Sequence, residues 1–212
     1  MPKFEINRPL FSHTKLDYYE CYAKTVLEYL FPERFSNLTM ADKPDIQSLV
    51  DDIGVEVTVA ESKKSIEAER LYSWLENTDH YRKQRNIERI KQCGAEYKKG
   101  MLLSYGGDNF ELVNNAVDRK NKKLQSAGYA SFKEYHLFIF SSTYADDSML
   151  QNEYVFLQNI HAGEYWGRIY VLVPGELYCF DFERATYERF VIDSNTQMQC
   201  AVKARQMVEE GE

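Results

Sequence analysis

The segment Pro44-Asp45-Ile46, followed by Ile53-Gly54-Val55-Glu56-Val57-Thr58-Val59-Ala60, decides the expected fold. In the second run three valines alternate with polar or small residues, which is the two-residue period of a β-strand with one apolar face. Glu56 and Thr58 therefore project from the same face of that strand. Two successive aspartates before the strand mark a turn, so Asp45 lies on a segment that leads directly into it.

Helices and strands alternate along the rest of the chain. Helices are expected at 15–31, 64–77, 81–93, 110–127 and 148–160 and from about residue 196, and strands at 135–142, 166–173, 176–182 and 187–192. Thr14 and Asp17 resemble a capping box for the first helix, Asn109 can cap the helix at 110–127, and a glycine-containing loop is expected before it. The alternation predicts an α/β or α+β fold, with a mixed central sheet flanked by helices.

Length and composition favour one globular domain. The chain has 212 residues, and 44% of them are hydrophobic, which is enough for one substantial core. Its apolar runs are too short to cross a bilayer, and its first residues contain no secretory or transit signal. We therefore expect a cytoplasmic protein with no membrane partner.

Several classes of site are excluded by the motifs that are missing. The four cysteines and four histidines are scattered, without a CxxC pair or an HExxH motif, which argues against a zinc site and a disulfide framework. No GxxxxGK[ST] or GxGxxG phosphate-binding loop occurs. Any metal ion in this protein must therefore be bound by oxygen atoms.

Positive charge is concentrated in two stretches, although the net charge is −7. Between residues 80 and 100 seven basic residues face two acidic ones, and between 112 and 136 five face two. Such stretches can bind a polyanion locally, or they can be ordinary solvated helix faces. The candidate nucleic-acid contacts are Arg82, Lys83, Arg85, Arg89, Arg119 and Lys123.

Two charged residues lie on or beside apolar helix faces. At 100° per residue, Lys120 falls near the middle of the apolar face of the helix at 110–127. Glu20 falls at the edge of the apolar stripe of the first helix. A lysine on an apolar face either has an acidic partner or extends from the helix edge to water. A glutamate that points inward binds either a basic neighbour or a metal ion.

Asp45 and Glu56 suggest a metal site on physical grounds. Two carboxylates that converge from neighbouring segments repel each other, and a hard divalent cation such as Mg²⁺ or Mn²⁺ relieves the repulsion. Such an ion lowers the pKa of a bound water and stabilises charge on a phosphodiester.

The Pro-Asp segment and the Glu-x-Thr strand together resemble the PD-(D/E)xK, or restriction-endonuclease-like, nuclease superfamily. The resemblance covers about residues 14–142, and 143–212 would be an elaboration of strands and a helix. It implies a nuclease that acts on DNA rather than RNA, with Mg²⁺ or Mn²⁺ bound by Asp45, Glu56 and the carbonyl of Val57. We expect Glu20 to bind through water or a second ion.

Thr58 departs from the family pattern, because it stands where a catalytic lysine is usual. Family members exist in which this lysine has moved to a nearby helix, and Lys120 is our candidate; Lys63 and Lys64 are weaker ones. The alternative is a catalytically inactive nuclease-fold binding or interaction protein. Convergence of Asp45, Glu56 and a lysine would favour the enzyme, and the sequence leaves the oligomeric state open, a dimer included.

Overall fold

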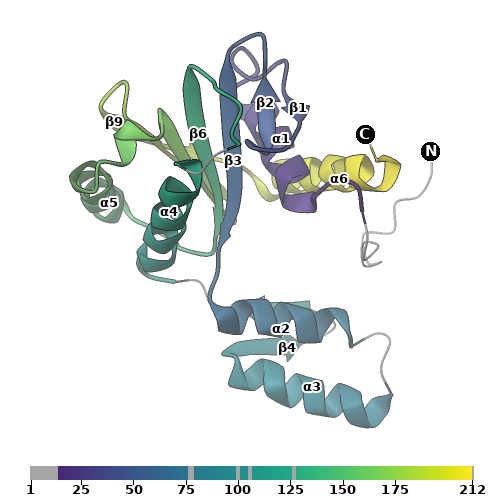
Figure 1. The fold of residues 1–212 in the computed structure, drawn as a ribbon. Coiled ribbons are helices and arrows are strands. Elements are labelled where there is room, and N and C mark those ends of the chain that lie inside the picture. The colour runs from purple at the N-terminus through teal and green to yellow at the C-terminus, as the bar shows by residue number, and fades with distance from the viewer. Residues whose placement is uncertain (1–13, 76–78, 99–100, 105–106, 126–127, 212) are drawn as a thin grey trace.

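The chain folds around a central sheet with helices on both faces and a separate helical arm at one end (Figure 1). A computed structural model describes residues 14–75, 79–98, 101–104, 107–125 and 128–211. Within these ranges no helix is long and apolar enough to cross a membrane.

Seven strands of the described chain form the sheet. In spatial order they are β1 (Thr39–Met40), β2 (Ile46–Ser48), β3 (Ile53–Ala60), β6 (Glu134–Ser141), β7 (Arg168–Val173), β8 (Glu176–Asp181) and β9 (Thr186–Val191). β3 pairs in parallel with β6, and β6 with β7, whereas the other neighbouring strands are antiparallel. This mixed sheet with flanking helices confirms the expected α+β class.

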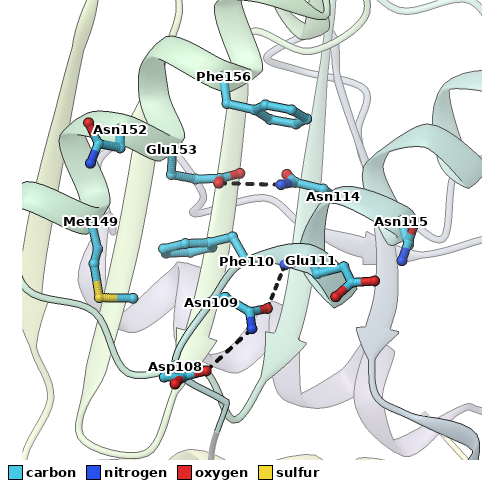
Figure 2. A pocket seen from close by; sticks show the side chains of 10 residues that line it. All are labelled: Asp108, Asn109, Phe110, Glu111, Asn114, Asn115, Met149, Asn152, Glu153 and Phe156. Carbon is cyan, nitrogen blue, oxygen red and sulfur yellow. Dashed lines mark hydrogen bonds between the residues drawn. The ribbon is translucent and has the colours of Figure 1, made fainter.

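Four helices cover the two faces of the sheet. They are α1 (Tyr18–Leu30) and α6 (Ser194–Glu210) on one face, and α4 (Glu111–Leu124) and α5 (Asp147–Asn159) on the other. Successive side chains of a strand point to opposite faces of the sheet. Phe138 of β6 therefore packs beneath α1, while Leu137 and Ile139 pack beneath α4 and α5. A groove separates the N-terminal halves of α4 and α5 (Figure 2).

The first helix begins later than the sequence predicts. Asp17 is its N-cap, and the carboxylate accepts hydrogen bonds from the backbone N–H groups of Tyr19 and Glu20. The predicted capping box of Thr14 and Asp17 is therefore wrong, because Asp17 closes the helix end itself. Asn109 does assist the start of α4, since its Oδ1 accepts from the Glu111 N–H at 3.1 Å.

Residues 63–104 form a unit that we call the arm. Its elements are α2 (Lys63–Ser73), α3 (His80–Gln92), β4 (Ala95–Lys98) and β5 (Met101–Ser104). They share a small hydrophobic cluster of their own, around Leu71 and Ile90, and they project from the sheet beyond the end of β3 (Figure 1). The antiparallel pair of β4 and β5 replaces the loop that the sequence predicts, because two short strands next to glycines and lysines show little alternation.

The last third of the chain completes the same sheet. β7 lies directly against β6, β8 and β9 follow, and α6 packs against α1 through Cys21 and Ala204. The expected nuclease-like core and its C-terminal elaboration are thus continuous in one sheet. A 3₁₀ turn, η1 (Ala162–Glu164), leads from α5 into β7.

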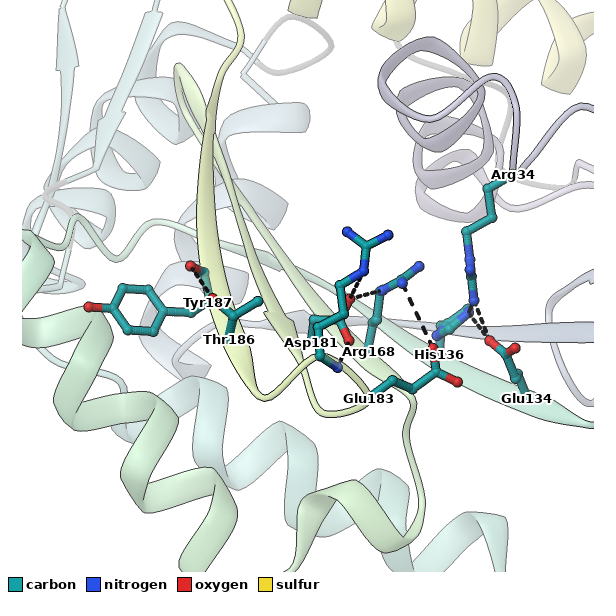
Figure 3. Close-up of polar contacts among 9 residues, drawn as sticks. Arg34, Glu134, His136, Arg168, Asp181, Glu183, Thr186 and Tyr187 are labelled. Carbon is teal, nitrogen blue, oxygen red and sulfur yellow. Dashed lines mark hydrogen bonds and ion pairs between the residues drawn. The ribbon is translucent and has the colours of Figure 1, made fainter.

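A network of buried and partly buried charges joins the segment after α1 to the sheet (Figure 3). Arg34 forms an ion pair with Glu134, and Nε2 of the fully buried His136 lies 3.5 Å from the same carboxylate. Nearby, Arg168 Nε donates to Asp181 Oδ2 at 2.6 Å. The hydrogen bond with His136 and the charge of Arg34 lower the pKa of Glu134 to about 2, against the opposing effect of burial.

Gly54 permits the close approach of β3 to the segment that carries Asp45. A Cβ atom at Gly54 would lie 2.5 Å from Pro44 Cγ and 3.1 Å from Phe132 Cδ2. We expect Gly54→Ala to lower the free energy of unfolding by about 1–3 kcal/mol, because the proline ring cannot move aside without its backbone. Urea denaturation should show this loss, whereas Gly107→Ala, whose Cβ would lie 3.4 Å from Thr143 Oγ1, should have little effect. Equal stabilities for the two variants would contradict the steric argument.

Glu134 should stabilise the fold above its unfolded pKa. Its pKa falls from 4.5 to about 2 on folding, so the stabilisation is complete above about pH 4.5 and disappears as the pH falls towards 2. We expect the free energy of unfolding to fall less steeply over this range in Glu134→Gln than in the wild-type protein. Urea denaturation between pH 2 and 6 measures both slopes, and identical slopes would contradict the prediction.

Candidate active site

Asp45 is held at the edge of β3 by a backbone hydrogen bond. The β2–β3 ladder ends with the pair Ile46 and Val55, so the next N–H group on that edge, from Val57, has no strand partner there. The carboxylate of Asp45 supplies the acceptor that a neighbouring strand would otherwise provide. Its Oδ2 accepts a hydrogen bond from Val57 N at 2.7 Å. In a strand the N–H and C=O of one residue point to the same edge, so the Val57 carbonyl also faces the side of Asp45.

Lys120 lies between the two carboxylates, as the sequence predicts. Its side chain, 9% exposed, comes from the apolar face of α4. Its Nζ lies 2.5 Å from Glu56 Oε2 and 3.6 Å from Asp45 Oδ2. Glu56 is completely buried, so the ammonium group supplies the partner that a carboxylate needs in the interior.

Two further cations of α4 lie next to these groups. Lys123 Nζ is 3.6 Å from Glu56 Oε2, and its side chain is still partly exposed. Arg119 Nη2 donates to Thr58 Oγ1 at 2.8 Å. The hydroxyl at the position of the usual lysine is therefore in contact with a guanidinium group, and α4 presents three cations along the strand that carries Glu56.

Burial and neighbouring carboxylates raise the pKa values of Asp45 and Glu20. Burial raises the pKa of Asp45, and the charge of Glu56 raises it further, while Lys120 and the Val57 N–H oppose both effects. Burial also raises the pKa of Glu20 to about 7, together with the charges of Asp45 and Asp17 and against that of Lys120. The charges of the same acidic pair therefore affect the pKa of Glu20, which lies in the first turn of α1.

Tyr129 is a residue at this site that sequence analysis missed. Its hydroxyl and Glu56 Oε1 are both buried. Burial, the charge of Glu56 and a hydrogen bond with the Glu56 side chain raise the pKa of Tyr129, and Lys123 Nζ lies 6.0 Å from the centre of its ring. Tyr129 follows α4 outside any regular element, so no periodic pattern could have indicated its position.

The acidic side chains do not by themselves form a complete metal cage. Among the described residues, no three His, Cys, Asp or Glu side chains gather as a metal-binding group, and this includes Glu20, Asp45 and Glu56. The carboxylates that contact Lys120 are those of Asp45 and Glu56, and Glu20 lies outside this set.

The predicted nucleic-acid contacts lie in two separate places. Arg119 and Lys123 lie at the acidic pair, whereas the basic residues of the first stretch lie on α3, namely Arg82, Lys83, Arg85 and Arg89. Figure 1 shows α3 as the outer helix of the arm, with α2 between it and the sheet. Arg82 pairs there with Asp79 and Arg89 with Glu67, so these side chains do not flank the carboxylates.

Comparison of the chain with protein-family models, with curated proteins and with solved structures gives no match. The residues themselves, and the geometry that brings Asp45, Glu56 and Lys120 together, are therefore the evidence for a function.

Proposed function

We propose that this protein is a metal-dependent nuclease that hydrolyses phosphodiester bonds, with DNA favoured over RNA. The observation that carries the proposal is the position of Lys120, whose ammonium group contacts both Asp45 and Glu56. A lysine beside two carboxylates is the set that the resemblance to PD-(D/E)xK nucleases requires. Here the lysine comes from a helix rather than from position 58.

The order of the elements supports the same proposal. α1 precedes the β2–β3 hairpin that carries Asp45 and Glu56, and α4 and the parallel strand β6 follow. This is the order of helix, hairpin, helix and further strand that the resemblance implies. The arm is an insertion between the strand that carries Glu56 and the helix that carries Lys120.

The donor atoms suit a hard divalent cation, Mg²⁺ or Mn²⁺. Asp45, Glu56 and the Val57 carbonyl would hold it, because carboxylate and carbonyl oxygens are the ligands that such an ion prefers. Glu56 Oε1 is a buried oxygen near the Tyr129 hydroxyl, and coordination would give it a cationic partner. Lys120 would stay on Glu56 Oε2, the other oxygen of the same carboxylate.

Each residue would then have a separate task. The bound ion would supply an activated water and would stabilise negative charge on the phosphodiester. Lys120 would hold positive charge beside the attacking water, and Lys123 and Arg119 would attract the phosphate, with Thr58 orienting the guanidinium group. Glu20, whose pKa of about 7 is close to neutrality, could accept or donate a proton.

The polyanion would extend beyond the site. Arg82, Lys83, Arg85 and Arg89 on α3 would contact phosphates away from the scissile bond. Because such contacts release counterions, binding should weaken as salt is added.

A second reading has one specific observation in its favour. Thr58 carries no charge, and Lys120 and Lys123 already compensate the negative charges of Asp45 and Glu56. A site whose charges already compensate each other is also compatible with a nuclease-fold protein that binds a partner without catalysing a reaction. A metal titration and a cleavage assay distinguish the enzyme from the inactive binding protein.

Metal binding should depend on both carboxylates. In a calorimetric titration with Mn²⁺ we expect the wild-type protein to bind, and Asp45→Ala and Glu56→Ala each to abolish binding, because each removes a ligand. Glu33→Ala, at an exposed position outside the site, is the matched control and should bind normally. Unchanged affinity in both site variants would exclude the proposed metal site.

Catalysis should depend on Lys120. With a mixed pool of DNA and RNA and Mg²⁺ or Mn²⁺, we expect Lys120→Met to lower turnover by about two to four orders of magnitude, as expected for a lost electrostatic stabiliser. Lys122→Met is the control, since Lys122 is exposed on the same helix and pairs with Asp118. Circular dichroism would establish that both variants are folded.

Two results would count against the role of Lys120, and a third would count against the enzyme. Full activity of Lys120→Met would refute the role of that lysine. Equal losses in Lys120→Met and Lys122→Met would point to a general effect of charge on the helix. Salt-sensitive binding of nucleic acid without any cleavage by the wild-type protein would favour the inactive binding protein.

A further inference from the structure

The groove between α4 and α5 lies apart from Asp45 and Glu56 and has no part in the proposed nuclease reaction. Its volume is about 630 Å³, which is in the range of small-molecule sites. The described residues that line it include Phe110 and Asn114 of the α4 side and Met149, Glu153 and Phe156 of α5.

The charged side chains among the described lining residues are all acidic. Asp108 and Glu111 lie at the N-terminal end of α4, where the helix dipole stabilises a carboxylate. Glu153 is different, because it lies in the middle of α5 and is only 5% exposed. Burial raises its pKa to about 7, and a hydrogen bond from Asn114 opposes this rise.

Two buried acceptor atoms belong to side chains that line the groove, and neither has a hydrogen-bond partner among the described residues. Asn114 Nδ2 lies 3.4 Å from Glu153 Oε2, and Figure 2 shows the two side chains pointing at each other across the groove. The other oxygen of each group, Glu153 Oε1 and Asn114 Oδ1, is buried and has no hydrogen-bond partner among the described residues. Both atoms accept hydrogen bonds, so a ligand with N–H donors would supply what these two acceptors lack.

Apolar side chains lie on both sides of this polar pair. Figure 2 shows Phe156 on one side of the Glu153–Asn114 contact, and Phe110 and Met149 on the other. Phe156 is 41% exposed, which leaves its ring accessible from solvent. Such walls can hold a methylene stem, and an aromatic ring attracts a cation placed over its face.

We infer that this groove is a binding site for a small organic cation, which carries ammonium or guanidinium N–H donors on an apolar stem. The N–H groups would donate to Glu153 Oε1 and Asn114 Oδ1, and the stem would lie against Phe110 and Phe156. The positive charge would compensate a carboxylate that has no cationic partner within the described residues of the groove.

The test uses agmatine, which has a guanidinium and an ammonium group on a four-carbon stem, and the neutral 1,4-butanediol as its counterpart. We expect calorimetry of the whole chain to show binding of agmatine only, and Glu153→Gln to weaken it by about tenfold or more, because a buried charged acceptor is lost. Glu164→Gln, at an exposed glutamate outside the groove, is the control and should change affinity by less than about twofold. Asn114→Leu should also weaken binding and offers a second variant if Glu153→Gln does not fold.

The source of the cation is distinguished by a second probe, acetyl-Leu-Arg-Leu-amide. Tighter binding of this peptide than of agmatine would identify a protein side chain as the ligand, and weaker binding would identify a free amine. The inference would be overturned by equal binding of agmatine and butanediol, by no binding of agmatine at millimolar concentration, or by equal losses in Glu153→Gln and Glu164→Gln.

Discussion

A lysine ammonium group held against two buried carboxylates is the interaction on which the rest of this structure depends. Removing an ion from water costs several kcal/mol, and only close partners offset that cost. Glu56 is fully buried and Lys120 nearly so, which means that β3 and α4 must approach until the two groups touch. Breaking the pair would leave a carboxylate uncompensated, so this contact fixes where α4 lies over the sheet.

Asp45 extends that constraint from the helix to the sheet edge. Its carboxylate continues the hydrogen bonding of β3 where β2 ends, and it also lies 3.6 Å from Lys120 Nζ. Gly54 and Pro44 make this possible, because they allow the hairpin to pack closely behind the acidic pair. A rigid frame of this kind is what the proposed chemistry needs, since charge stabilisation depends on groups that are already in position.

Sequence reasoning succeeded where a regular period carries the information. The apolar positions of α4 placed Lys120 on the buried face, and strand alternation placed Glu56 and Thr58 together. It failed at Tyr129, which lies outside any regular element, and at the hairpin of β4 and β5. It also failed for the start of α1, because both Thr14 and Asp17 can cap a helix and only the folded backbone selects between them.

By itself the sequence determined the fold class, the order of the helices and of the longer strands, and the identity of the residues that carry charge, because these follow from local periodicity and composition. Only the tertiary structure decided which charges meet. It brought Lys120 to Asp45 and Glu56, placed Arg119 on Thr58, and carried the basic residues of α3 away on the arm. The physical reason is that ion pairing depends on distances between segments far apart in the chain, and no local pattern contains those distances.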